Sequence, residues 1–124
     1  MANCKPSRVK LDVAKRLDIV CRKGDTFNLV INVTDSTGAA VDLTTYSDFR
    51  MEVRESDTAA STIIADSNVT ITGTSGGVLT VTISNTIMEG VDGGLYAYDL
   101  ETIKSGVVQT WLTGVFRVNE DVTV

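Results

Sequence analysis

The feature of this sequence that most constrains its fold is the alternation of apolar and polar residues in short stretches. The clearest stretch runs from Phe27 to Thr34, where every second residue from Phe27 onward is apolar and mostly polar residues fall between. The same period of two recurs at residues 49–55, 78–84 and 95–103. Side chains alternate between the two faces of a β-strand, and no helical period is sustained anywhere in the chain. The alternation therefore predicts half-buried strands and an all-β protein.

Turn sequences separate these stretches about every eight to twelve residues. They are rich in glycine, serine and aspartate, and they lie at Arg22–Asp25, Asp35–Gly38, Gly73–Gly77 and Lys104–Gly106. We count seven or eight strands, a number typical of an antiparallel β-sandwich or barrel. A jelly roll or a small barrel is the alternative. A chain of 124 residues fits one domain with a core that needs no covalent staple.

Two local departures from the strand pattern are expected. Residues 85–90 could form one helical turn at a corner, with Ile87 and Met88 closing the end of the core. Gly114 lies within the last strand, where a glycine often marks a β-bulge. We therefore predict a short helix before the tyrosine-containing strand and a bulge at Gly114.

The stretch from Val91 to Leu100 carries the spacing Asp-x-Gly-x-Tyr-x-Tyr, formed by Asp92, Gly94, Tyr96 and Tyr98. In immunoglobulin-like sandwiches, a tyrosine at the start of the sixth strand bonds its hydroxyl back to the chain just upstream, and a disulfide cysteine follows two residues later. Tyr96 has the place of that tyrosine, and Tyr98 has the place of the cysteine. The spacing predicts an immunoglobulin-like antiparallel β-sandwich of seven to eight strands with no disulfide.

Charge is distributed unevenly along the chain. Residues 1–24 contain two acidic side chains and seven basic ones, which are Lys5, Arg8, Lys10, Lys15, Arg16, Arg22 and Lys23. Residues 25–124 contain fourteen acidic and four basic side chains, and the whole chain has a net charge of −5. These basic residues either line solvated strand faces or dock on an acidic neighbour, including another copy of the chain. Because the rest of the chain is acidic and would repel phosphate, nucleic acid is not the expected partner.

The charge and strand patterns together suggest a division of the chain. We predict a basic N-terminal arm or edge strand at 1–16, the sandwich at 17–118 and a C-terminal tail at 119–124. We also expect that residues 1–24 can be removed without unfolding the sandwich.

The cysteines and the N-terminus indicate where the protein is made. Cys4 and Cys21 are the only cysteines, which suits two thiols in a reducing compartment. The N-terminus lacks the apolar run of a signal peptide, and no stretch approaches the roughly 18 apolar residues of a membrane span. We expect synthesis in the cytoplasm and no membrane partner.

The residue inventory argues against catalysis. The sequence contains no histidine, which is the commonest general base and metal ligand. Asp99 and Glu101 lie two apart on one strand and face the same way, and we expect them to line a solvated strand face and not to form a catalytic pair. Gly76–Gly77 lies between strands and precedes no helix, so it does not form a phosphate cradle. We expect no enzyme activity, no cofactor and no metal site.

Five segments follow one another in a characteristic order: Lys23–Leu29, Val41–Thr44 followed by Tyr46, Phe49–Arg54, Gly94–Glu101 and Gly114–Val118. In this order they resemble the small immunoglobulin-like domains of structural proteins from tailed bacteriophages. The resemblance spans roughly residues 17–118 and includes the N-terminal domain of phage baseplate upper proteins and free-standing head-decoration proteins. It implies a virion protein that binds other proteins and carries no active site.

The resemblance implies a function that can be stated more narrowly. A baseplate protein would be expected to continue into a fibrous region, whereas this chain stops at Val124. We therefore expect a capsid auxiliary or decoration protein, made in the host cytoplasm, that binds across major capsid subunits or other virion proteins and stabilises the head.

Two alternatives remain open. One is a tail or baseplate component. The other is an adhesion module that binds a carbohydrate or receptor, for which Tyr46 and Trp111 are the candidate exposed aromatics, although Trp111 is better explained as a core residue.

Overall fold

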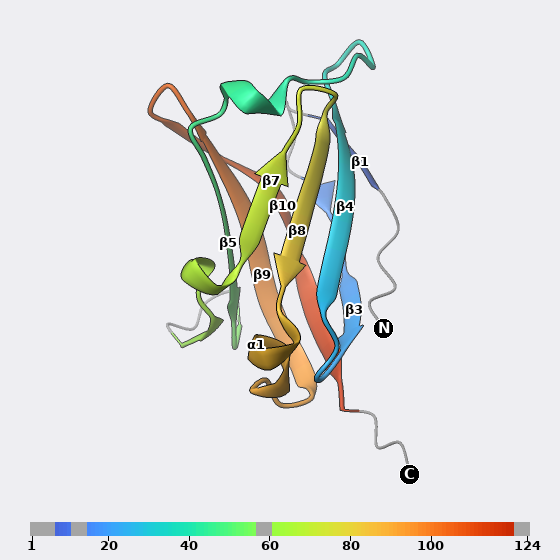
Figure 1. The fold of residues 1–124 in the computed structure, drawn as a ribbon, viewed down its shortest axis with the longest axis vertical. Coiled ribbons are helices and arrows are strands. Elements are labelled where there is room, and N and C mark those ends of the chain that lie inside the picture. Colours follow the sequence, from blue (N-terminus) through green and yellow to red (C-terminus); the bar gives the residue numbers. More distant parts are fainter. Residues whose placement is uncertain (1–6, 11–14, 57–60, 121–124) are drawn as a thin grey trace.

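The computed structural model describes residues 7–10, 15–56 and 61–120, which form two facing β-sheets (Figure 1). Sheet A has the strand order β1 (Ser7–Lys10), β4 (Phe27–Thr34), β8 (Val78–Ile83), β7 (Thr70–Gly73). Sheet B has the order β2 (Lys15–Arg16), β10 (Val107–Asn119), β9 (Gly94–Lys104), β5 (Asp48–Arg54), β6 (Thr62–Ile64), and β3 (Ile19–Arg22) joins β10 on the same edge as β2. The predicted all-β sandwich is confirmed.

The described residues contain ten strand segments, more than the number read from the sequence. The main reason is that β2 and β3 are two short pieces of one edge, interrupted at Leu17 and Asp18. The N-terminal segments also pair in parallel, β1 with β4 and both β2 and β3 with β10, whereas the other pairings among the described strands are antiparallel. The first strands thus form edges of both sheets.

The core lies between the sheets and is built from the alternate residues that the sequence pattern places inward. Along β4 the buried positions include Phe27, Leu29, Ile31 and Val33, as predicted. The Phe27 ring packs on Phe116 of β10 with centroids 5.4 Å apart, which joins the two sheets. No disulfide is needed for this packing.

One short helix closes the end of the core. Helix α1 (Asn85–Glu89) begins after Ser84, whose Oγ accepts a hydrogen bond from the Ile87 N–H at 3.3 Å. Met88 is fully buried beneath the sheets, so the predicted helical turn is confirmed. Two 3₁₀ turns, η1 (Leu43–Thr45) and η2 (Asp66–Asn68), complete the connections.

The tyrosine-corner motif forms the contacts that its spacing predicts. The Tyr96 hydroxyl donates to the Asp92 carbonyl at 2.6 Å. Tyr98 points into the core, and its hydroxyl donates to the carbonyl of Leu17, which joins β9 to the interrupted edge strand. A Cβ on Gly94 would meet only the Tyr96 ring, at 3.6 Å, whereas one on Gly93 would meet the Glu120 Cβ at 2.6 Å. The tight glycine of this corner is therefore Gly93.

The predicted bulge at Gly114 is wrong. The ladder between β9 and β10 slips between Thr110 and Leu112, so the bulge lies at Trp111, and Trp111 and Leu112 both point inward. Gly114 pairs regularly with Tyr98. Its lack of a side chain lets another segment approach, because a Cβ there would lie 2.5 Å from the Leu17 carbonyl oxygen and 2.9 Å from Asp18 Oδ1.

The expectation that residues 1–24 are dispensable is also wrong. Ile19 and Cys21 are buried in the core, and β3 pairs with β10 over four residues. The Cys21 thiol lies 3.5 Å from the Arg117 carbonyl, to which it donates. Removing this segment would expose the core and strip one edge of sheet B.

We predict that Gly114→Ala destabilises the protein by about 1–3 kcal/mol, because the new methyl group collides with the backbone of Leu17. Gly76→Ala is the control, since a Cβ there has only Thr74 Oγ1 near it, at 3.8 Å. Urea unfolding followed by tryptophan fluorescence gives both values. Equal stability of the two variants would contradict the close approach.

We predict that Tyr98→Phe costs about 1–3 kcal/mol, because it leaves the Leu17 carbonyl without its donor inside the protein. Tyr96→Phe should cost less, about 0.5–1.5 kcal/mol, since Asp92 is exposed and water can replace the hydroxyl. The reverse order in urea unfolding would contradict the assignment of Tyr98 as the main tie.

The Tyr96 hydrogen bond should also depend on pH. Burial, and then the charge of Asp92, raises the pKa of the Tyr96 hydroxyl above its usual value of 10.0. The folded state therefore favours the neutral hydroxyl, and its contribution is complete below about pH 10 and lost as pH rises through the folded pKa. The difference in unfolding free energy between wild type and Tyr96→Phe should be constant from pH 7 to 9 and shrink above about pH 10. A difference that grows at high pH would contradict this.

Candidate interaction surfaces

The basic residues of the N-terminal segment follow one side of the sandwich, where β1 and β3 lie (Figure 1). Lys5 lies outside the described residues, and Arg8 and Lys10 are placed only by their backbone, in β1 opposite Asn32 and Thr34 of β4. The structure thus divides these basic residues between the edges of two sheets.

The other basic residues of this segment lie along the edge of sheet B. Lys15 and Arg16 are exposed on β2, and Arg16 pairs with Asp18 at 3.2 Å. Arg22 and Lys23 are half-buried, and Lys23 pairs with Asp92 at 3.3 Å. Lys15 and Arg16 are therefore the exposed basic residues of this segment along the edge of sheet B.

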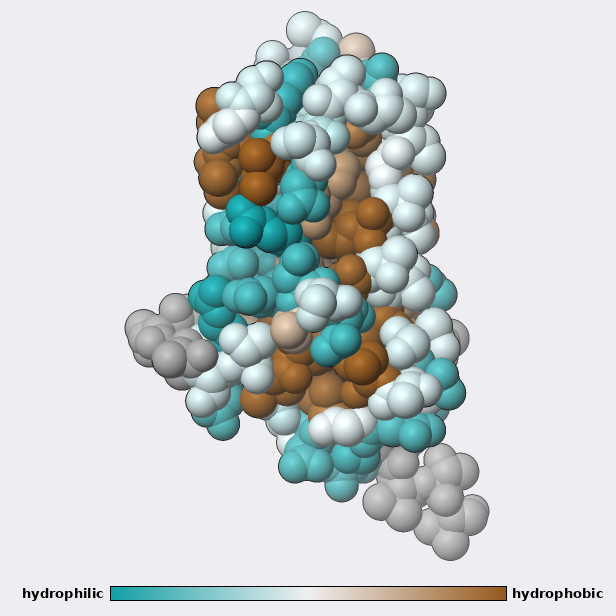
Figure 2. Space-filling view, turned by 60° about the vertical axis from the view of Figure 1, so that its left-hand side comes forward, coloured by the Kyte–Doolittle hydropathy of each residue, from teal (hydrophilic) through white to brown (hydrophobic). Residues whose placement is uncertain are grey.

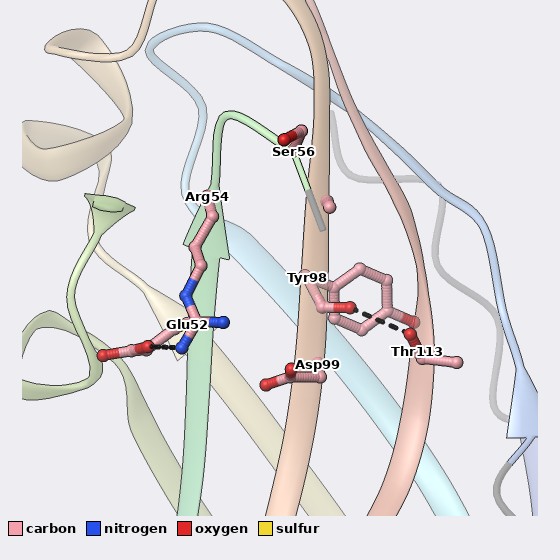
Figure 3. Close-up of a pocket in the computed structure, with 7 residues that line it drawn as sticks. Glu52, Arg54, Ser56, Tyr98, Asp99 and Thr113 are labelled. Carbon is pink, nitrogen blue, oxygen red and sulfur yellow. Dashed lines mark hydrogen bonds and ion pairs between the residues drawn. The ribbon is translucent and has the colours of Figure 1, made fainter. Parts of the chain in front are cut away.

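The outward face of sheet B is charged across its middle. In the register of β5 and β9, Arg50 lies opposite Glu101 and Glu52 lies opposite Asp99. Arg54 Nη2 contacts Glu52 Oε1 at 2.6 Å, and Figure 3 shows this pair on β5 with Asp99 on the neighbouring strand. The hydrogen bond that Arg54 donates to Glu52, followed by the charge of Glu52, raises the pKa of Arg54. The arginine thus offsets two facing carboxylates.

Two hollows in the charged middle of this face are small. The one beside Arg54, Asp99 and Thr113 has a volume of about 40 Å³, close to that of a single water molecule. A second, between Arg50 and the carboxylates of Glu52, Asp66 and Glu101, has about 180 Å³. Sites for small-molecule ligands usually have about 300–1,000 Å³. This face is therefore suited to meeting charged side chains of another protein.

The outward face of sheet A has the opposite character. The described side chains that point outward from β4, β8 and β7 carry no charge, and they are Asn28, Val30, Asn32, Thr70, Thr72, Val78, Thr80 and Thr82. Thr82 Oγ1 donates to Asn28 Oδ1 at 2.8 Å across two strands. These three strands thus form an uncharged surface in an acidic protein, bordered by β1, whose backbone places Arg8 opposite Asn32 and Lys10 opposite Thr34.

Two turns are fixed by exposed carboxylates. Asp42 accepts from the Thr44 hydroxyl and N–H at the start of η1, and these bonds lower the pKa of Asp42. Asp35 accepts from the Thr37 hydroxyl and from the backbone of Thr37 and Ala39, which lowers the pKa of Asp35. Both carboxylates therefore hold the backbone of loops at one end of the sandwich.

The aromatic residues do not form an open sugar platform. Trp111 is buried, and its ring meets Tyr46 edge-on at 5.2 Å and Phe49 at 6.1 Å. Tyr46 is half-buried, which raises the pKa of its hydroxyl, and Lys104 Nζ lies over its ring at 5.0 Å. Stacking on a sugar needs an accessible ring face, so this cluster is better described as the packed end of the core.

The exposed large apolar residues lie at the two ends of sheet B. Val20 and Leu95 flank Arg117 in one row across β3, β10 and β9, and Val107 and Val108 lie at the hairpin between β9 and β10. Because Val107 and Val108 are neighbours on opposite faces and both are more than half exposed, this hairpin projects beyond the packed sandwich.

The described part of the chain shows no cluster of three or more acidic, cysteine or histidine side chains arranged to hold a metal ion. Within those residues no helix is long and apolar enough to cross a membrane.

Sequence reasoning found the basic residues and missed the contrast between the two outward faces. The sequence contains the information for this contrast, because the residues between the apolar positions of each strand are the ones that point outward. The uncharged set on sheet A could have been read from the threonines of residues 70–72 and 80–82 together with Asn28 and Asn32.

Comparison with known proteins shows which fold this chain shares. The sequence matches no protein-family model, and it matches none of the curated proteins. Among solved structures, the chain is similar to the N-terminal domain of phage TP901-1 ORF48, with a TM-score of 0.51 and 10% sequence identity. The similarity covers 94% of this chain and 100% of that domain. At this identity it shows a shared sandwich fold.

Proposed function

We propose that this protein is a structural component of a tailed-bacteriophage virion and acts by binding other virion proteins. The observation that carries the proposal is the similarity in fold to a complete phage domain, over nearly the whole of this chain. It agrees with the resemblance that the sequence itself shows in the segments around Lys23–Leu29 and Gly94–Glu101.

The surfaces support a role in protein binding. The outward face of sheet A is uncharged across β4, β8 and β7, and the outward face of sheet B is charged across its middle, where the hollows are small. Protein interfaces commonly combine a neutral contact area with charged groups that fix orientation and speed association. A sandwich with one face of each kind can bind one neighbour and orient itself against another.

The narrower proposal is attachment to the capsid, where the protein would bridge major capsid subunits and stabilise the head. A capsid lattice repeats the same site many times, so one small domain can occupy each repeat. The exposed pair Lys15 and Arg16 would meet an acidic partner surface.

A tail or baseplate position is the second candidate. The specific observation in its favour is that the similar phage domain is the N-terminal part of a longer protein, so this fold also serves as a module joined to further structure.

The location of the protein in purified particles tests the proposal. We expect immunogold labelling or cryo-electron microscopy of the phage that encodes it to show the protein in a regular array on the head. Labelling confined to the tail would replace the capsid assignment with the tail one. Absence from particles would overturn the virion role.

Rebinding to particles assembled without this protein tests the basic pair. We predict that Lys15→Gln combined with Arg16→Gln weakens rebinding at least tenfold at low salt, and that added salt weakens the wild type, because exposed charges are screened. Ser36→Glu combined with Ser75→Glu is the control, since it makes the same change in net charge at exposed turn residues. Equal weakening by both double variants would show that only net charge matters.

A further inference from the structure

Strand β7 (Thr70–Gly73) is an uncharged edge of sheet A. It lies last in the strand order and pairs with β8 alone among the described residues. From Val69 to Val78 the sequence has no charged residue and no proline. Charged residues, proline, bulges and covering loops are the usual devices that keep an edge strand from pairing with another chain. The sequence of β7 has neither charge nor proline.

The neighbouring edge of sheet B is protected. The Phe49 N–H donates to Asp48 Oδ1 at 2.9 Å, and the Met51 N–H donates to Asp66 Oδ1 at 3.1 Å. Further along β5, Val53 pairs with Ile64 of the short strand β6. Two carboxylates and a short strand thus occupy the outer side of β5, whereas the described residues place no strand on the outer side of β7.

The hydrogen-bond pattern shows which groups β7 presents outward. The Thr74 N–H donates to the Val78 carbonyl at 3.0 Å. In an antiparallel pair, bonded residues alternate, so the backbone groups of Thr70 and Thr72 also point to β8. The backbone groups of Ile71 and Gly73 therefore point away from the sheet, whereas the Val69 N–H already donates to the Asp66 carbonyl at 3.0 Å.

Apolar side chains lie beside this edge. Figure 2 brings this side of the molecule forward and shows hydrophobic side chains gathered on it, bordered by hydrophilic ones. Ile71 of β7 and Val69 just before it are partly buried and pack against the core. A strand added to β7 would cover part of this apolar area.

We propose that β7 pairs with β7 of a second copy of this chain, antiparallel and centred on Ile71. In this register Ile71 lies opposite Ile71 of the second copy, and Thr70 lies opposite Thr72 of the second copy. Ile71 then forms a hydrogen-bonded pair with Ile71 of the second copy, and the Gly73 N–H of each copy donates to the Val69 carbonyl of the other. The four-stranded sheets of the two copies become one continuous sheet across a two-fold axis.

The second copy is favoured as occupant because the edge is complementary to itself. Cross-strand pairs of threonine with threonine are favourable, and isoleucine opposite isoleucine extends the apolar area. Each copy carries a net charge of −5, so two copies repel one another elsewhere, and an uncharged edge is where they can meet. The pairing does not depend on the virion role proposed above.

Light scattering coupled to size exclusion, with sedimentation at about 10 µM to 1 mM protein, tests the pairing. We expect wild type to reach twice the 13.3 kDa chain mass. The variant T70K/T72K places lysines opposite lysines and should raise the dimer dissociation constant at least tenfold. Both threonines are exposed, so circular dichroism should show an intact fold.

Two further variants make the test specific to the edge and the register. T70E/T72K places a glutamate opposite a lysine in the proposed register, and it should keep a dissociation constant within about threefold of wild type. N32K adds a charge to the same outward face but on the central strand β4, and it should leave the dimer unchanged. The proposal is overturned if the wild type stays monomeric at 1 mM, if the dimer survives T70K/T72K, or if the dimer is lost in N32K. A T70E/T72K variant that dimerises as weakly as T70K/T72K would overturn the proposed register. Pairing of β7 only with a strand of another protein would appear as a monomeric wild type.

Discussion

The attachment of Leu17 and Asp18 to strands β9 and β10 is the contact on which the rest of the sandwich depends. The Leu17 N–H donates to the Thr113 carbonyl at 2.9 Å, and the Leu17 carbonyl accepts from the Tyr98 hydroxyl. Asp18 Oδ1 accepts from the Val115 N–H at 3.0 Å, and Gly114 leaves the space for this approach. These polar contacts tie the N-terminal edge to the centre of sheet B where an antibody domain would use a disulfide. They also explain why β2 and β3 are separate segments of one edge.

Most of the fold could be predicted from the sequence because a β-strand shows its buried face locally. The alternation from Phe27 to Val33 gave the correct inward residues, and the motif ending at Tyr98 gave the correct corner. The errors came from contacts between distant segments. A glycine in a strand can mark a bulge or make room for another chain segment, and the sequence of β10 does not distinguish these, so Gly114 was misread. Residues 1–24 were read by their charge, although Ile19 and Cys21 already had the inward spacing of a strand.

The candidate surfaces were predictable in part. The charged outward residues of β5 follow directly from the alternation between Phe49 and Val53. The protection of the β5 edge could not be read, because Asp66 reaches the Met51 N–H from another element. The neutral face of sheet A could not be predicted without knowing that β8 pairs with β4, because these two strands are far apart in the chain. A sequence shows which side chains share a face of one strand, and the pairing of strands decides which faces add up to a surface.

The parallel pairing of β3 with β10 sets the order in which the protein can fold. Residues 19–22 are made early in synthesis, and their partners at residues 116–119 are made almost a hundred residues later. Until the last strand has left the ribosome, the early strand has no sheet to join, and Ile19 and Cys21 stay exposed to water. Contacts between residues so far apart in sequence slow folding and prolong the exposure of apolar surface. The nascent chain thus stays vulnerable to aggregation until β10 has been made, and the completion of β10 is the step that protects it.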